Sequence, residues 1–204
     1  WPAGAYSFGL LVTERKMPFE LPPPRILRWR RLAARREHAF SVFTVERLTL
    51  QAPEKEPRDF FTLAMPDWAN VIAVTPAGNV LLVRQYRFGT DDFSLETPGG
   101  VIDPGETPEA GARRELLEET GYRAARFELL SCLEPNPALQ GNRCFTFIAW
   151  DAEPVAAPCF DDAEECEVLE VPRGALAAIL DEGHVRHALI VAPLERFLRR
   201  FAAV

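Results

Sequence analysis

The sequence lacks any apolar run as long as the roughly eighteen residues that a membrane-spanning helix requires. Its first thirty residues also lack the ordered basic, apolar and small-residue regions of a secretory signal peptide. We therefore expect a protein without a membrane partner.

Cysteine is scarce, with four in 204 residues. Cys132, Cys144, Cys159 and Cys166 have neither the paired spacing of a zinc site nor the density of a disulfide scaffold. Isolated cysteines of this kind are typical of small apolar side chains. The composition predicts reduced thiols and a cytoplasmic location.

Positive charge is in deficit, because 23 Lys and Arg oppose 30 Asp and Glu, for a net charge of -7. Proteins that bind a nucleic-acid backbone usually carry a basic face, so we expect no nucleic-acid partner. No Ser/His/Asp or Cys/His arrangement indicates a covalent nucleophile. Two of the three histidines, His184 and His187, lie far along the chain from the acidic segment described next, and we expect no catalytic role for either.

What is present is a strongly marked helix over residues 108–120. Thr107 can accept a backbone N–H as N-cap, Pro108 suits the first helical position, and Gly121 can take the left-handed conformation that ends a helix. Residues three and four apart share a helix face, so Glu115, Glu118 and Glu119 project together.

Three carboxylates on one patch repel one another unless a cation neutralises them. Oxygen ligands in this number suit Mg²⁺ or Mn²⁺, which keep waters and bind substrate phosphates. The alternative is an ordinary solvated face, in which Arg114 pairs with Glu118 one turn further on. Gly99, Gly100 and Pro104 favour the first interpretation, because they allow a sharp turn and a close backbone approach that a solvated helix does not need.

The whole segment resembles the signature of the Nudix hydrolases. The match begins at Gly100 and continues, after a spacer of five residues, with Glu106. After seven more residues it includes Arg114-Glu115-Leu116, then Glu118-Glu119 after one residue, and Gly121 and Tyr122 after one more. Tyr122 stands where the family more often has an aliphatic residue, a departure that concerns packing and not chemistry.

The resemblance implies an α/β fold, specifically an α/β/α sandwich with a mixed β-sheet. It also implies hydrolysis, with Mg²⁺ or Mn²⁺, of a nucleoside diphosphate linked to another moiety. By this resemblance Glu115, Glu118 and Glu119 are metal ligands, with Glu115 and Glu119 central to catalysis, and Gly99 contributes its backbone carbonyl. Arg114 and Glu106 would hold the helix and the loop.

Within the family, the chain is most similar to the ADP-ribose and nucleotide-sugar pyrophosphatases. The elements that carry this likeness are Arg84-Gln85-Tyr86-Arg87, Leu95-Glu96, Pro135, Pro137 and residues 167–172. The resemblance implies that Arg87 holds phosphate, and Arg84 and Glu96 are further candidates for substrate binding.

The acidic loop at residues 161–165 matches the loop that supplies the general base in that branch. Glu164 is the matching residue, and Asp162 and Glu165 are close alternatives because the register is uncertain by one or two residues.

The chain before the signature divides into two parts. Residues 1–24 hold Gly, Pro and mixed residues with no sustained period and predict an irregular segment or tail, and Met17 lies where a start codon could be. Residues 25–66 predict a small antiparallel sheet, with strands at 40–50 and 59–65. Such a sheet cannot bury both faces by itself, so we expect it to pack on the main domain, residues 67–204, or on a second subunit.

The basic stretch at residues 25–36 has two interpretations. It is either a solvated edge strand or turn, or a positive arm that reaches substrate phosphates, even across a dimer. Members of the branch commonly form homodimers in which an aromatic residue stacks on the base. Trp29, Phe40 and Phe43 are the candidates here, and the sequence does not rank them.

The remaining elements follow from apolar patterning. Strands are expected at residues 69–75, 80–86, 127–133, 143–150 and 166–171, and helices at 172–181 and 186–201. Three functions stay open: a pyrophosphatase for ADP-ribose or a nucleotide sugar, a Nudix hydrolase of a dinucleotide, coenzyme or nucleoside triphosphate, and a non-catalytic module that binds nucleotides.

Overall fold

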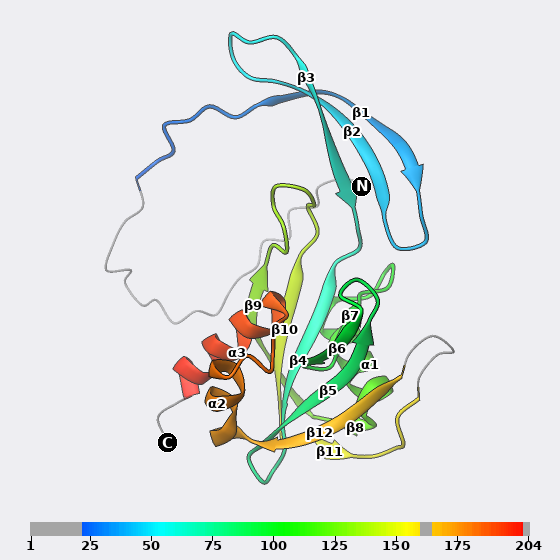
Figure 1. The fold of residues 1–204 in the computed structure, drawn as a ribbon, viewed down its shortest axis with the longest axis vertical. Coiled ribbons are helices and arrows are strands. Elements are labelled where there is room, and N and C mark those ends of the chain that lie inside the picture. The colour runs from blue at the N-terminus through cyan, green and yellow to red at the C-terminus, as the bar shows by residue number, and fades with distance from the viewer. Residues whose placement is uncertain (1–21, 160–164, 202–204) are drawn as a thin grey trace.

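The computed structural model describes residues 22–159 and 165–201, and a seven-stranded sheet forms its centre (Figure 1). Along the sheet the order is β12-β5-β4-β10-β9, with β6 beside β5 and β7 beside β4. β10 runs parallel to β4, and the other pairs are antiparallel, so the sheet is mixed, as predicted. The strands of this central sheet are β4 (Trp68–Val74), β5 (Asn79–Arg87), β6 (Asp92–Glu96), β7 (Gly99–Val101), β9 (Arg126–Leu133), β10 (Cys144–Trp150) and β12 (Cys166–Pro172). A two-stranded pair, β8 (Tyr122–Arg123) and β11 (Glu153–Pro154), lies beside it.

Helices cover both faces of the central sheet, which makes the α/β/α sandwich that was predicted (Figure 1). The helices are α1 (Pro108–Thr120), the 3₁₀ turn η1 (Arg173–Ala175), α2 (Leu176–Asp181) and α3 (Ala188–Phe201). On one face Leu116 of α1 packs with Val71 and Phe147. On the other, Leu194 of α3 packs with Ile72 and Ile148. Successive residues of a strand point to opposite faces, and here both faces are buried, so β4 is apolar without interruption from Val71 to Val74.

The helix over residues 108–120 is confirmed together with both of its ends. The hydroxyl of Thr107 accepts the Ala110 backbone N–H at 3.1 Å, and Pro108 is the first helical residue. Gly121 ends the helix with a φ of 74°. Local capping chemistry is enough to position this helix, because each signal acts within one turn of the helix end.

A separate antiparallel sheet, here called the outer sheet, precedes the central one. It consists of β1 (Arg30–Ala39), β2 (Thr44–Gln51) and β3 (Arg58–Ala64), in that order. The strand expected at 40–50 begins only at Thr44, because β1 and β2 pair and the chain must reverse between them. The basic stretch is an exposed edge strand from Arg30 onward, which agrees with the first of its two interpretations.

The outer sheet projects beyond the central sheet (Figure 1). Its backbone joins the rest of the described chain at Leu63, whose N–H donates to Leu139 O at 2.9 Å. Leu48 is the only buried residue of β1–β3. This joint is one contact of the outer sheet with the main domain, and packing on a second subunit stays a prediction.

All four cysteines are free, as expected. Burial raises the pKa of the Cys144 thiol to about 12, so this side chain is uncharged at neutral pH. Among the described residues, no helix combines the length and the apolar character needed to cross a membrane.

The end of α1 provides a test of this packing. A Cβ at position 121 would lie 2.1 Å from Ala156 O, on a backbone with positive φ. Gly121→Ala should therefore lower the free energy of unfolding by roughly 2 to 4 kcal/mol in urea titration. Gly89→Ala is the matched control, because nothing lies within 4 Å of its Cβ. Equal stability of the two variants would contradict this account of the helix end.

Candidate active site

The centre of the site is the contact between α1 and the glycine loop before it. Glu119 Oε2 accepts the backbone N–H of Gly99 at 2.8 Å. A Cβ at position 100 would lie 2.5 Å from Glu115 Oε1, so a side chain there would displace that carboxylate. Position 99 is equally restricted, since its Cβ would lie 2.3 Å from Ala69 O. Gly99 thus lets β7 lie close to β4, Gly100 leaves space beside Glu115, and the buried carboxylates of Glu115 and Glu119 both lie against the backbone of β7.

Arg114 ties the loop to the helix. Its guanidinium donates to both carboxylate oxygens of Glu106, at 3.1 and 3.2 Å, and to Val101 O at 2.8 Å. Its Nη1 also donates to Glu115 Oε1 and Glu118 Oε2, at 2.8 and 2.9 Å. The hydrogen bonds from Arg114 lower the pKa of Glu106. The contacts agree with the predicted role of Arg114 and Glu106 in holding the loop and the helix together.

These contacts have features of both interpretations of the acidic face, the solvated helix face and the cation site. Arg114 does pair with Glu118, as an ordinary helix face would, and it pairs with Glu115 as well. In the part of the chain that the structure describes, no three His, Cys, Asp or Glu side chains are already arranged around a cation position. A cation at Glu115 and Glu118 would compete with Arg114 for the same oxygens, because both are attracted by the same negative charge.

The donor set fits a hard divalent cation. Glu115, Glu118 and Glu119 offer carboxylate oxygens on one side of α1, and the loop at Gly99 and Gly100 brings backbone close to two of them. Oxygen donors of this kind suit Mg²⁺ and Mn²⁺ better than softer metals. The fit rests on the chemistry of the donors and on the space that Gly100 leaves beside Glu115.

A second cluster lies at the ends of β5 and β6. Arg87 donates Nε and Nη2 to the two oxygens of Glu96, both at 2.8 Å, and Nδ1 of His187 lies 3.0 Å from Glu96 Oε2. Burial by itself would raise the pKa of Glu96, but the hydrogen bonds from Arg87 and His187 outweigh it and hold this pKa well below its usual range. Arg87 and Glu96, both predicted for substrate binding, are thus brought together.

His187 belongs to this cluster although the sequence did not place it there. It is 91 residues from Glu96 in the chain, and nothing in the local pattern marks it. Its contact exists only because α3 packs on the sheet and places the residue before its first turn next to β6.

Other predicted residues lie apart from these clusters. Arg84 pairs with Glu167 of β12 at 3.0 Å, and it is three residues from Arg87, so strand alternation sends the two side chains to opposite faces. Trp29 makes an edge contact with Phe60, at 5.4 Å between ring centroids, on the outer sheet. In the single chain, therefore, Arg84 and Trp29 are not brought to the α1 carboxylates.

The remaining aromatic candidates lie between β1 and β2, and the acidic loop is described only in part. Phe40 and Phe43 face each other across the turn between β1 and β2, with centroids 4.9 Å apart. Glu164 and Asp162 lie outside the described residues. Glu165 is described and exposed. The identity of the general base stays a prediction.

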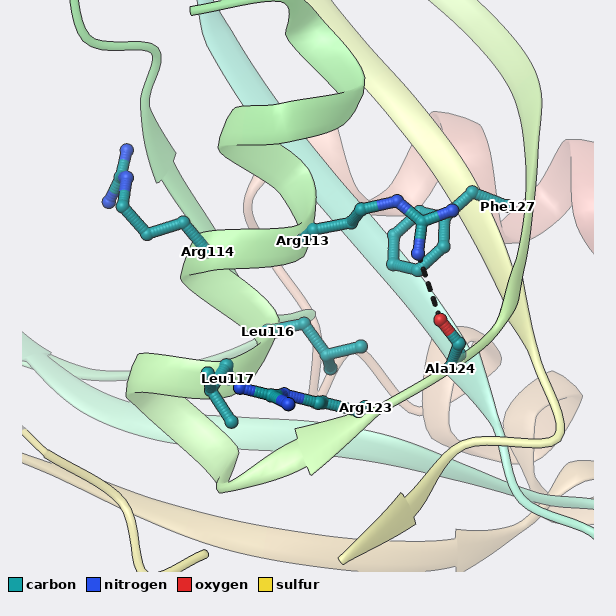
Figure 2. Close-up of a pocket in the computed structure, with 7 residues that line it drawn as sticks. All are labelled: Arg113, Arg114, Leu116, Leu117, Arg123, Ala124 and Phe127. Atoms are coloured by element: carbon teal, nitrogen blue, oxygen red, sulfur yellow. Dashed lines mark hydrogen bonds between the residues drawn. The ribbon is translucent and has the colours of Figure 1, made fainter. Parts of the chain in front are cut away.

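A shallow hollow of about 410 Å³ beside α1 is a different feature (Figure 2). Arg113 crosses it, with its guanidinium 4.0 Å from the Phe127 ring centroid and Nη1 2.9 Å from Ala124 O. Figure 2 shows Arg114 pointing away from Arg113 and Phe127. Glu115, Glu118 and Glu119 do not line this hollow, so it is separate from the carboxylate site.

Comparison with known proteins supports the family. The family model for the NUDIX domain matches residues 65–190, more than half of the chain. The chain belongs to the NUDIX family. The matched region of this NUDIX chain contains the glycine loop, α1, and the Arg87, Glu96 and His187 cluster.

Several relatives carry names that concern ADP compounds. An ADP-ribose pyrophosphatase of Bacillus subtilis is 33% identical over 107 residues, 52% of this chain and 58% of that protein. An ADP-sugar pyrophosphatase of Mus musculus is 36% identical over 111 residues, 50% of this chain and 49% of that protein. The chain thus spans about half the length of these relatives.

Longer alignments point to the same group. The ADP compounds hydrolase NudE of Escherichia coli is 29% identical over 142 residues, 69% of this chain and 74% of that protein. A crystal structure of an ADP compounds hydrolase has a TM-score of 0.72 and 22% identity, covering 89% of this chain and all of that one. At this identity the structural likeness shows the NUDIX fold alone.

The charge of Glu96 can be tested by stability. Its folded-state pKa is depressed, so its ionised form stabilises the fold at pH values above the ordinary glutamate pKa of about 4.3, and this contribution falls as the pH drops below that value. Glu96→Gln should lower the free energy of unfolding by roughly 2 kcal/mol at pH 7. Urea titrations between pH 7 and pH 3 should show the difference from wild type shrinking with acid. A difference that is constant over this range would contradict the assignment of a buried, ionised Glu96.

Proposed function

We propose that this NUDIX chain hydrolyses the pyrophosphate bond of a nucleoside diphosphate linked to a sugar, ADP-ribose or a nucleotide sugar. The products would be a nucleoside monophosphate and a sugar phosphate. The observation that carries the proposal is the approach of Glu115 and Glu119 to the backbone of the glycine loop, with Glu118 on the same helix. Carboxylates held in this way are suited to a divalent cation that in turn binds phosphate oxygens.

The choice of substrate class rests on the relatives. Proteins similar to this chain are named ADP-ribose pyrophosphatase, ADP-sugar pyrophosphatase, ADP compounds hydrolase and GDP-mannose pyrophosphatase. All four names concern a nucleoside diphosphate or its derivative, which supports the same class for this chain. A cytoplasmic location agrees with the free cysteines and with such substrates.

Each residue then has a defined task in the proposed reaction. Glu115, Glu118, Glu119 and the Gly99 carbonyl would hold Mg²⁺ or Mn²⁺, which when bound neutralises phosphate charge and makes water more acidic. Arg87, whose side chain is 44% exposed, binds a phosphate oxygen of the substrate while Glu96 orients it. Glu106 and Arg114 keep the loop against the helix. Glu164 is the proposed general base, with Asp162 and Glu165 as alternatives.

Product analysis tests this function. The full chain with Mg²⁺ should convert ADP-ribose, UDP-glucose or GDP-mannose to a nucleoside monophosphate and a sugar phosphate, separated by ion-exchange chromatography. A triphosphate cleaved to monophosphate and pyrophosphate, or a dinucleotide or coenzyme as the preferred substrate, would indicate the alternative NUDIX hydrolase. Binding without turnover of any of these compounds would indicate a non-catalytic nucleotide-binding module.

In the same assay, one variant of α1 tests the proposed metal ligands and a second variant is its control. Glu119→Gln removes a charge but keeps an amide oxygen that can accept the Gly99 N–H, so it should lower kcat by about two orders of magnitude with little change in stability. Glu109→Gln removes a carboxylate from the first turn of the same helix, where it pairs with Arg113, and should leave kcat unchanged. Near-normal turnover by Glu119→Gln would refute the proposed metal ligands.

We also propose that the outer sheet mediates a homodimer. Exposed apolar side chains project from it, including Leu32 and Phe61, whose exposed fractions are 43% and 53%. A three-stranded sheet with so little buried surface gains stability when a partner covers one face. Within a single chain, Trp29 and the basic strand β1 do not reach the proposed substrate site. In a dimer, the Trp29 or β1 of one copy could reach the substrate bound by the other.

Sedimentation velocity tests the dimer. The wild-type chain should sediment as a species of twice the chain mass, and Phe61→Glu should shift it toward the monomer, because a buried charge without a partner is costly. Arg113→Gln changes a charge beside α1, away from the outer sheet, and should stay dimeric. A monomeric wild type at micromolar concentrations would contradict the proposal.

A further inference from the structure

His187 occupies a position that packing determines. Its backbone carbonyl accepts the N–H groups of Ile190 and Val191, both at 2.9 Å, so it lies at the start of α3. Ile190, Leu194 and Phe197 of α3 are buried against the central sheet. The imidazole therefore projects from a backbone that cannot move without disturbing the core.

The imidazole and Arg87 share one carboxylate. Glu96 is 3% exposed, and it receives two bonds from Arg87 and one from His187. An ionised carboxylate only accepts hydrogen bonds, so Nδ1 of His187 carries the proton that it shares with Glu96 Oε2. Because Arg87 and His187 hold the Glu96 carboxylate from two sides, its orientation is fixed. The Arg87 guanidinium that is bonded to it is oriented in turn.

A second contact fixes the same part of the chain. Arg186 donates to Asp92 Oδ2 at 2.6 Å and to Phe93 O at 3.3 Å. Asp92 is the cross-strand partner of Arg87 in the β5–β6 pair. The two residues before α3 thus attach the helix to the hairpin that carries both Arg87 and Glu96.

We propose that His187 is a positioning residue for substrate binding. Its hydrogen bond to Glu96 holds the Arg87–Glu96 ion pair in the orientation in which Arg87 receives a phosphate of the substrate. The inference rests on the proposed function of Arg87. Because the guanidinium is oriented before the substrate arrives, binding does not require ordering it.

Paired substitutions separate positioning from general stability. His187→Leu removes the donor, whereas His187→Asn places an amide N–H near the position of Nδ1. His184→Leu is the matched control, since His184 is 61% exposed and contacts Glu182 instead. With ADP-ribose and Mg²⁺, His187→Leu should raise KM about five- to tenfold and leave kcat within about twofold, because a hydrogen bond to a charged group is lost from substrate binding and not from the chemical step. His187→Asn should restore most of the KM, and His184→Leu should match wild type.

A spectroscopic measurement is independent of turnover. In the ¹⁵N-labelled full chain, the Nε–H resonance of Arg87, assigned by its loss in Arg87→Lys, should shift or broaden in His187→Leu and return in His187→Asn. A wild type without turnover would contradict the proposed function, while this resonance would still test the positioning role. An unchanged KM and an unchanged resonance in a folded His187→Leu, or His187→Asn behaving like His187→Leu, would overturn the proposal.

Discussion

The close contact between α1 and the glycine loop is the constraint on which the site depends. Carboxylates of one helix repel each other, and they stay together only where other groups offset that repulsion. Here the backbone N–H of Gly99 contacts Glu119, and Arg114 lies between Glu115 and Glu118. A side chain at position 100 would collide with the Glu115 carboxylate, and one at position 99 would collide with the backbone of β4, so the two glycines determine how closely the loop fits between helix and sheet.

The central sheet supports both clusters of charged side chains. α1 lies on one face and supplies the acidic side chains, while α3 lies on the other (Figure 1) and is directly preceded by His187. The antiparallel strands β5 and β6 contribute Arg87 and Glu96, whose long side chains meet in an ion pair. Each contributing element is held by its own buried contacts, and such rigid placement would suit the phosphate recognition that we propose for Arg87.

The outer sheet is stabilised differently from the central sheet. Its strands are linked by polar cross-strand contacts such as those of Arg47 with Glu37 and Asp59, and not by a core. Exposed ion pairs of this type contribute little to stability, so the sheet depends on its backbone pairing and on whatever covers its apolar side chains. This distinguishes it from the central sheet, where Val71 and Ile72 of one strand are both fully buried.

The sequence by itself determined the features whose causes are local. The bounds of α1 follow from Thr107, Pro108 and Gly121, and the shared face of its glutamates follows from helical spacing. Only the tertiary structure decided that Arg84 pairs with Glu167, that the chain turns at residues 40–43, and that His187 meets Glu96. Such contacts join residues far apart in the chain, and they arise from how helices and strands pack, which leaves no periodic mark in the sequence around either partner.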